Sequence, residues 1–223
     1  MQKYIDATWP APKNIRALTS LREAELKDLN LPTDPFWIKQ THGNAVVRID
    51  QAQQTPSLPE ADASVSFTSN TVCMVRTADC LPVFLCDQQG TQVAVVHCGW
   101  RSLAANILEN TCKQFTAPLQ GCMVWLGPAI GPQAFEVGKD VLDGFAAHGW
   151  SQEQLASGFK PHTPGKWLGD LYTLARLTLQ QQGIPAENIY GGEWCTYSDP
   201  ARFYSYRRSR DAGRMFNLIW IAD

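Results

Sequence analysis

Two histidines and one cysteine lie at the ends of apolar stretches, where a chemical role is more natural than a packing role. His42 lies in the turn 41–44, His97 closes an apolar run, and Cys80 lies between two apolar runs in the string TADCLP (77–82). Imidazole and thiolate are preferred ligands of zinc, and three of them leave a fourth tetrahedral position for water or substrate. These residue types predict a catalytic zinc ion held by His42, Cys80 and His97.

Two other interpretations stay open on the residues alone, because the spacing is too wide for a zinc-finger signature. In the first, His97 activates Cys80 as a nucleophile without any metal, as in thiol hydrolases. In the second, the roles are structural: His97 ends a strand, Cys80 is a buried thiol and His42 is a solvated turn residue. Asp62 and Asp79 lie near these residues in sequence, and either could orient an imidazole, exchange a proton or cap a turn.

Two arginines are candidate substrate-binding residues. Arg101 follows Gly99 at an expected helix start, and its guanidinium suits a phosphate group near free backbone amides. Arg207 belongs to the densest basic cluster, which could bind an anion or form a solvated face. His148 and His162 have no partner motif and are expected at the surface.

Composition limits the classes of partner and location. The formal net charge of −2 gives no field that would attract nucleic acid, so nucleic acid is not expected as a partner. No signal peptide and no apolar run of about 18 residues is present, so we expect a cytoplasmic protein without a membrane partner. The seven cysteines are scattered and are expected to be mostly small buried residues rather than a disulfide framework.

Apolar patterning predicts alternating strands and helices. Residues 82–86 and 92–97 form buried strands joined by a tight turn around Gly90, and a helix follows at 100–115. Further strands are predicted at 36–40, 45–49, 71–76, 122–126, 135–137, 188–190, 203–206 and 215–221, and helices at 139–147 and 170–182. The first two of these strands would form a hairpin with His42 in its turn. Loops are expected at 51–60 and 211–213, and residues 1–35 are expected to be irregular apart from a short polar helix at 20–29. No linker divides the chain, so a single domain over 1–223 is expected.

Several ordered strings of the sequence match one protein family. They are QTHGNAVV (40–47), RTADCLPVFLCD (76–87), VAVVHCGWR (93–101), WLGPAIGP (125–132), FEVG (135–138), GGEWCTY (191–197) and FYSYRR (203–208). Together they resemble the bacterial laccase-domain family, also described as YfiH-type or multicopper polyphenol oxidase-like. The resemblance covers residues from about 36 to the C-terminus.

The resemblance implies a fold and a metal. The fold would be a single-domain α/β sandwich with a central mixed β-sheet flanked by helices. The histidine of the THG motif, the cysteine of the ADC motif and the histidine of the HxGWR motif bind a catalytic zinc in that family, and here these are His42, Cys80 and His97. Copper is the less favoured metal, because a multicopper oxidase needs more than the four histidines present.

The resemblance also implies an activity. The first expectation is a zinc-dependent purine nucleoside phosphorylase for adenosine, inosine, guanosine and methylthioadenosine that also deaminates adenosine, with Trp100 and Phe203 offering ring surfaces for the base. The second is a peptidoglycan editing amidase that removes L-serine from UDP-MurNAc-L-Ser. The third is a copper polyphenol oxidase (laccase). A zinc-stabilised binding module would need a fourth protein ligand, which the sequence does not offer.

Two departures from the family pattern are visible. The segment Ala17–Asp34 is short and glycine-free, where the family has an Arg-Gly-Gly motif and a Ser-Leu-Asn-Leu-Gly segment. Cys98 and Ser102 replace an alanine and a glycine beside His97. We expect the Cys98 side chain to point away from His97 and to pack in the core.

Overall fold

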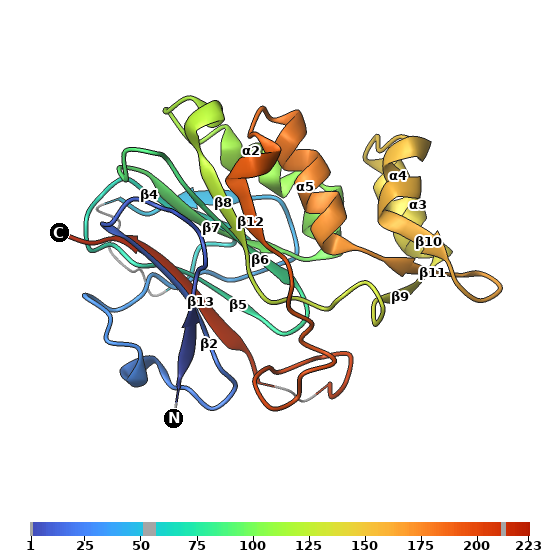
Figure 1. Cartoon of the computed structure of the whole chain (residues 1–223), viewed down its shortest axis with the longest axis horizontal. Coiled ribbons are helices and arrows are strands. Elements are labelled where there is room, and N and C mark those ends of the chain that lie inside the picture. The colour runs from blue at the N-terminus through green and yellow to red at the C-terminus, as the bar shows by residue number, and fades with distance from the viewer. Residues whose placement is uncertain (1, 51–56, 211–212) are drawn as a thin grey trace.

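The computed structural model describes residues 2–50, 57–210 and 213–223, which form three stacked layers: helices, a six-stranded sheet and a four-stranded sheet (Figure 1). The six-stranded sheet has the order β12 (Ile189–Gly191), β8 (Met123–Leu126), β6 (Leu81–Cys86), β7 (Val93–Cys98), β4 (Ala63–Ser66) and β3 (Val46–Arg48). The β12–β8 and β3–β4 pairs are parallel, and the other pairs are antiparallel. The predicted α/β sandwich with a central mixed sheet is therefore confirmed.

The second sheet lies against one face of the first. It has the order β1 (Tyr4–Asp6), β2 (Ile15–Ser20), β13 (Met215–Ile221) and β5 (Cys73–Thr77), with antiparallel pairs from β1 to β5. Alternate residues of β6 and β7 pack toward this sheet, among them Phe84 and Val95. Their neighbours Val83 and Val96 pack toward the helices. Because both faces are covered, both strands are buried throughout, which explains their continuous apolar sequences.

Helices cover the other face of the six-stranded sheet (Figure 1). They are α1 (Trp100–Ala104), α2 (Ile107–Cys112), α3 (Lys139–Ala147), α4 (Gln152–Gly158) and α5 (Leu171–Gln181). A small antiparallel sheet of β10 (Phe159–Pro161), β11 (Lys166–Gly169) and β9 (Glu136–Gly138) lies beside α3 and α4. Short 3-10 turns occur at Leu26–Asp28, Leu119–Gly121 and Ala186–Asn188. None of the helices in the described ranges is both long enough and apolar enough to cross a bilayer.

Most of the central predictions are confirmed, with boundaries shifted by a residue or two. The β6–β7 hairpin turns at Gly90, whose φ of 70° is the left-handed conformation that favours glycine. The helix predicted at 139–147 is α3, and the helix predicted at 170–182 is α5, which begins after Asp170 because its carboxylate accepts the Thr173 N–H.

Several local predictions were wrong. No hairpin forms around His42, because residues 36–40 make only isolated bridges to Cys73 and Glu60 while β3 pairs in parallel with β4. The helix predicted at 100–115 is broken into α1 and α2 at Asn106, which adopts a left-handed φ of 67°. Residues 203–205 have no regular secondary structure and a turn begins at residue 206, so the strand predicted at 203–206 does not form.

The N-terminal segment is more regular than predicted, because β1 and β2 extend the second sheet and the polar helix shrinks to the 3-10 turn Leu26–Asp28. The expected loops at 51–60 and 211–213 lie partly outside the described residues.

Candidate metal centre

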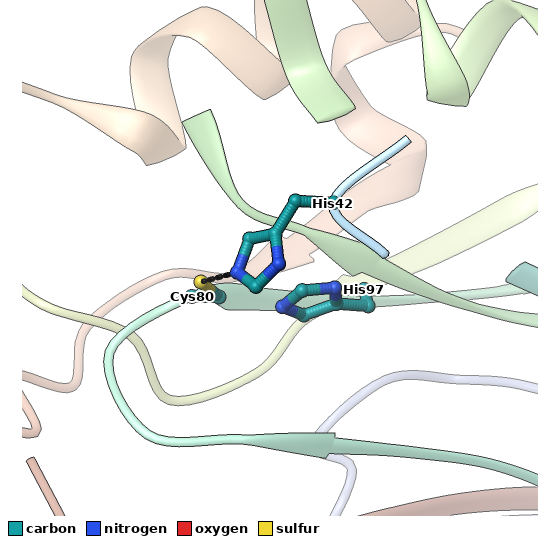
Figure 2. Close-up of side chains that lie close together, drawn as sticks. All are labelled: His42, Cys80 and His97. Carbon is teal, nitrogen blue, oxygen red and sulfur yellow. Dashed lines mark hydrogen bonds between the residues drawn. The ribbon is translucent and has the colours of Figure 1, made fainter. Parts of the chain in front are cut away.

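His42, Cys80 and His97 come from three separate segments and meet at one end of the six-stranded sheet (Figure 2). Cys80 immediately precedes β6, and His97 is opposite Pro82 near the end of β7, so the antiparallel pairing of these strands brings the two side chains together. His42 reaches them from the loop before β3. One donor atom from each residue lies within 4.8 Å of the other two. The Cys80 Sγ to His42 Nε2 distance is 4.0 Å, and the two imidazole rings are nearly perpendicular, at 82°.

A fully buried carboxylate, Asp62, fixes both histidines. It accepts the His97 Nδ1–H at 2.7 Å, and it accepts the backbone N–H groups of Thr41, His42 and Gly43 at 3.1, 3.0 and 2.7 Å. The loop therefore wraps around the carboxylate instead of forming a hairpin, and His42 takes a positive φ of 59°. The possibility that Asp62 orients an imidazole is confirmed in its geometry.

The same contacts determine the charges of the site. Burial opposes ionisation of the Cys80 thiol, but the adjacent His97 and hydrogen bonds with both imidazoles lower its pKa to about 6. Burial also opposes a charge on His97, yet Cys80 and Asp62 raise the pKa of that imidazole to about 9. Burial opposes ionisation of Asp62 as well, but the hydrogen bonds from His97 and the 41–43 loop hold its pKa below the usual value. The thiol is thus poised to be a thiolate, the form that binds a metal or attacks a substrate.

Gly99 leaves room for this cluster. A Cβ atom at position 99 would lie 3.0 Å from Cys80 Sγ and 3.3 Å from His42 Cδ2. Its φ of −67° is open to any residue, so the constraint here is space and not backbone conformation. The absence of a side chain at Gly99, the glycine of the HCGWR string, therefore lets Cys80 and His42 pack close to the backbone.

The three donor residues line a cavity of about 740 Å³, a size typical of small-molecule sites. Apolar groups also line it, including Ile38, Ile130 and Phe135. Two exposed hydrophobic side chains, Leu58 and Tyr206, belong to the same lining. Among the described residues, the lining contains one carboxylate, Asp79, and five cationic side chains, namely Lys39, Arg76, Arg101, Arg207 and Arg214. An overall negative chain thus concentrates positive charge at this cavity.

Asp62 bonds to a histidine, whereas Asp79 orders one wall of the cavity. Its carboxylate accepts the hydroxyls of Thr196 and Ser205 at 2.6 and 3.0 Å and the Arg207 N–H at 2.7 Å. It holds these contacts from a left-handed backbone, with φ at 92°. Asp79 directly precedes Cys80, so these hydrogen bonds connect the segment before β6 to the loop that carries Tyr206 and Arg207.

Both predicted substrate-binding arginines line the cavity. Arg101 is exposed, and its guanidinium lies 4.3 Å from the Trp100 ring centroid. Arg207 donates from Nη1 to the Glu136 carbonyl at 2.9 Å. Trp100 lines the cavity as well while also packing against the core.

Other predictions had mixed outcomes. Phe203 is fully buried and does not line the cavity, so its predicted contact with a base was wrong; it packs against Trp194. Cys98 is buried among core residues on the helix side, opposite His97, as predicted. His148 and His162 are exposed and bond to the Gly144 carbonyl and the Glu136 carboxylate.

The sequence did not reveal three other groups of the cavity. Arg76 is an exposed residue of β5, Arg214 precedes β13, and Tyr206 is about half exposed at 49%. The pairing of Met215 with Thr77 brings β13 and β5 together at this edge. The available signals were the positions of Arg76 inside the RTADC string and of Tyr206 inside the FYSYRR string.

Comparison with known proteins gives consistent matches. The family described as multi-copper polyphenol oxidoreductase laccase matches residues 13–222. A relative from Pseudomonas aeruginosa, named purine nucleoside phosphorylase PA4543, is 40% identical over 100% of both chains. The protein of Escherichia coli K12 named purine nucleoside phosphorylase YfiH is 39% identical, over 99% of this chain and 100% of its own. A protein of an unknown prokaryotic organism named adenosine deaminase RL5 is 32% identical, over 88% of this chain and 76% of its own.

A solved structure confirms the fold. The crystal structure of the Neisseria meningitidis protein NMB0706 superposes with a TM-score of 0.90 and 37% identity, and the match covers 100% of both chains. The structure of YlmD from Geobacillus stearothermophilus has a TM-score of 0.87 at 21% identity, which supports the fold alone.

Proposed function

This chain belongs to the multi-copper polyphenol oxidoreductase laccase family, and we propose that it is a zinc-dependent purine nucleoside phosphorylase. Its proposed substrates are adenosine, inosine, guanosine and methylthioadenosine with phosphate, and it would also deaminate adenosine. The chain is an enzyme, as are the relatives that match it over most of their length. The observation that carries the proposal is a pair of imidazoles and a thiolate converging on a cationic cavity of small-molecule size.

We propose that His42, Cys80 and His97 are the zinc ligands and, through the metal, the catalytic residues. The donor set suits zinc, and Asp62 occupies Nδ1 of His97, which leaves Nε2 to face the cluster, as is usual for metal-bound histidine. Among the residues that the structure describes, no further His, Cys, Asp or Glu joins the group. Three protein donors leave the open position of a catalytic site.

Zinc is favoured over copper. The two remaining histidines, His148 and His162, are exposed and do not line the cavity, so the chain lacks the histidines of a multicopper centre. When bound, zinc would supply a Lewis acid that polarises an oxygen atom and lowers the pKa of water.

The other residues of the cavity would bind and orient the reactants. We propose that the guanidiniums of Arg101 and Arg207 hold inorganic phosphate, because arginine donors match phosphate oxygens in pairs. Trp100, Phe135 and Tyr206 offer ring surfaces to a purine. In phosphorolysis a phosphate oxygen forms a bond to C1′ of the ribose while the C1′–N9 bond breaks, and the purine leaves with the electron pair and takes up a proton.

We also propose a cytoplasmic location. All seven cysteines are free thiols, and Cys80 must stay reduced to serve as a ligand, which agrees with a reducing compartment. The proposed partners are small molecules, and no nucleic acid or membrane partner is proposed.

A second candidate is the amidase that removes L-serine from UDP-MurNAc-L-Ser. The five cationic side chains favour it, because that substrate is more anionic than a nucleoside. In that reaction water would add to the amide carbonyl, the C–N bond would break, and the amine of L-serine would leave with the electron pair and take up a proton. The nucleoside function ranks first because relatives that match the whole chain have that name.

The deciding experiment gives one zinc-loaded preparation inosine plus phosphate, in parallel with the L-serine and L-alanine forms of UDP-MurNAc. We expect slow phosphorolysis of inosine that depends on added phosphate. Cys80→Ala should abolish it, whereas Cys98→Ala should not, because the Cys98 side chain lies on the opposite face of β7.

Two results would change the assignment. A kcat/KM at least about tenfold higher for the L-serine amide, equal to about 1.4 kcal/mol of transition-state stabilisation, would place the amidase first. Full activity in the metal-free protein would instead support a thiol hydrolase that uses Cys80 and His97.

A further inference from the structure

Three arginines of the cavity share one kind of contact. Each guanidinium lies over an aromatic ring, and the distances to the ring centroid are 5.2 Å for Arg76 on Trp37, 4.3 Å for Arg101 on Trp100 and 5.8 Å for Arg207 on Phe135. Within residues 2–50, 57–210 and 213–223, none of the three forms an ion pair with a carboxylate. All three line the same cavity.

A cation–π contact of this kind favours one position of the guanidinium and occupies none of its N–H donors, which can bind phosphate oxygens in pairs. Arg207 gives one donor to the Glu136 carbonyl and keeps the others. Three positive charges around one cavity, without carboxylate partners among the described residues, also raise the local concentration of anions. One inorganic phosphate, held by Arg101 and Arg207 as proposed above, leaves Arg76 for a second anionic group.

Arg76 is fixed close to the metal cluster. The side-chain amide of Gln40 bonds to the Arg76 backbone in both directions, accepting its N–H at 2.8 Å and donating to its carbonyl at 2.9 Å. Gln40 is two residues before His42, and Arg76 is four residues before Cys80. These bonds hold the backbone of Arg76 to the segment that leads to His42, and its own strand leads to Cys80.

We infer that the cavity takes purine nucleoside 5′-phosphates in preference to nucleosides, with Arg76 binding the 5′-phosphate of the ribose. This inference rests on the proposed phosphorylase function and specifies its substrate class. Inorganic phosphate forms a bond to C1′, the C1′–N9 bond breaks, and the base leaves with the electron pair and takes up a proton. The sugar product is ribose 1,5-bisphosphate.

The test compares inosine 5′-monophosphate with inosine on the same zinc-loaded preparation of the full chain, at saturating inorganic phosphate. We expect kcat/KM at least about tenfold higher for the monophosphate. Arg76→Gln should lower that preference at least fivefold, and Arg76→Lys should retain more of it, because the charge remains. Arg22→Gln is the matched control: its guanidinium also lies 5.2 Å from a ring centroid, that of Tyr204, but outside the cavity. The control should keep the wild-type preference.

Equilibrium dialysis of the same ligands separates this inference from the proposed function. Tighter binding of inosine monophosphate than of inosine, lost in Arg76→Gln, supports the subsite even if neither compound is phosphorolysed, and that outcome would refute only the proposed function. Equal or weaker binding of the monophosphate would overturn the inference while leaving inosine phosphorolysis intact. Equally tight binding of uridine 5′-monophosphate would overturn its assignment to purines.

Discussion

Two buried carboxylates flank the cluster and organise different parts of the site. Asp62 accepts hydrogen bonds from the backbone N–H groups of the 41–43 loop and from the imidazole of His97. Asp79 accepts hydrogen bonds from two hydroxyls and one backbone N–H of the segment 196–207. Asp62 thus orders residues that would hold the metal, whereas Asp79 orders a wall that would contact the substrate.

If the proposed site is correct, the two carboxylates support metal binding and substrate binding separately. Each carboxylate already accepts at least three hydrogen bonds, so both act by positioning other groups. A substitution at Asp62 should therefore change the affinity for the metal, and a substitution at Asp79 should change the affinity for substrate.

Removal of a ligand on the Asp62 side should have the largest effect. His97→Ala should reduce bound zinc from about one ion per chain to near zero and lower kcat/KM by more than about 100-fold, because loss of a mere supporting residue already costs about 10- to 100-fold. Elemental analysis measures the zinc. His162→Ala removes an exposed imidazole paired with Glu136 and should keep full zinc. Full zinc in His97→Ala would remove this residue from the proposed site.

Asp62→Asn should weaken zinc binding by about 10- to 100-fold, since the acceptor that fixes His97 and the loop loses its charge. Competition with a chromophoric chelator gives the Kd. Asp79→Asn is the matched comparison, because it is also a buried carboxylate next to the cluster, and its zinc Kd should stay close to wild type. Equal losses in both variants would show that the two carboxylates do not have separate roles.

Gly99→Ala should weaken zinc binding by a smaller factor than Asp62→Asn. The added Cβ would approach Cys80 Sγ at 3.0 Å, so the thiol must move by a few tenths of an ångström. Gly149→Ala is not a fair control, because Gly149 has a φ of 86° and its replacement would strain the backbone. Ser102→Ala is the better control, because Ser102 lies in the first turn of α1 and is buried outside the lining of the cavity. Unchanged zinc affinity in Gly99→Ala would show that the cluster has spare room.

Asp79→Asn should raise KM several-fold with little change in zinc content. The Thr196 hydroxyl donates to Oδ1 of Asp79, whereas the Ser205 hydroxyl and the Arg207 N–H donate to Oδ2. An asparagine has one acceptor oxygen, so its NH2 group would replace the acceptor on one side and the charge would be lost, and the free energy of unfolding should also fall by about 1–3 kcal/mol. Steady-state kinetics and thermal melts measure the two effects. A drop in kcat with unchanged KM would indicate that Asp79 acts on the chemical step.

His42, Cys80 and His97 were predicted from sequence, but their types and spacing alone left two other interpretations open, and the THG, ADC and HxGWR motifs were needed to favour one shared site. The structure brings the three side chains together. The strands β6 and β7 were also predictable, because both faces are buried and their apolar runs are continuous. The separate roles of Asp62 and Asp79 were not predictable. The partners of Asp79 lie 117 and 126 residues away, and only the folded chain brings them together.

The errors have similar causes. The hairpin predicted around His42 fails because the loop bonds to a distant carboxylate, Asp62, instead of to its own flanking strands. Arg76 was missed because an exposed arginine in a strand resembles any solvated residue until β5 is placed beside the cavity. Long-range contacts therefore determine most of the cavity wall that we propose contacts the substrate, whereas motifs of the local sequence identify the residues that we propose hold the metal.

Removal of the metal should have the smallest effect, on the fold. Both strands that deliver Cys80 and His97 lie in the core between two buried clusters, and the Asp62 hydrogen bonds hold the 41–43 loop without any ion. A site built on such a preformed core does not organise folding, unlike a structural zinc. Chelation should therefore leave the far-UV circular dichroism spectrum nearly unchanged and lower Tm by only a few degrees. The same treatment of Asp62→Asn should disturb the loop more, because that variant lacks both the metal and the carboxylate. Cooperative unfolding of the wild type on chelation would show that the metal, and not Asp62, holds the site together.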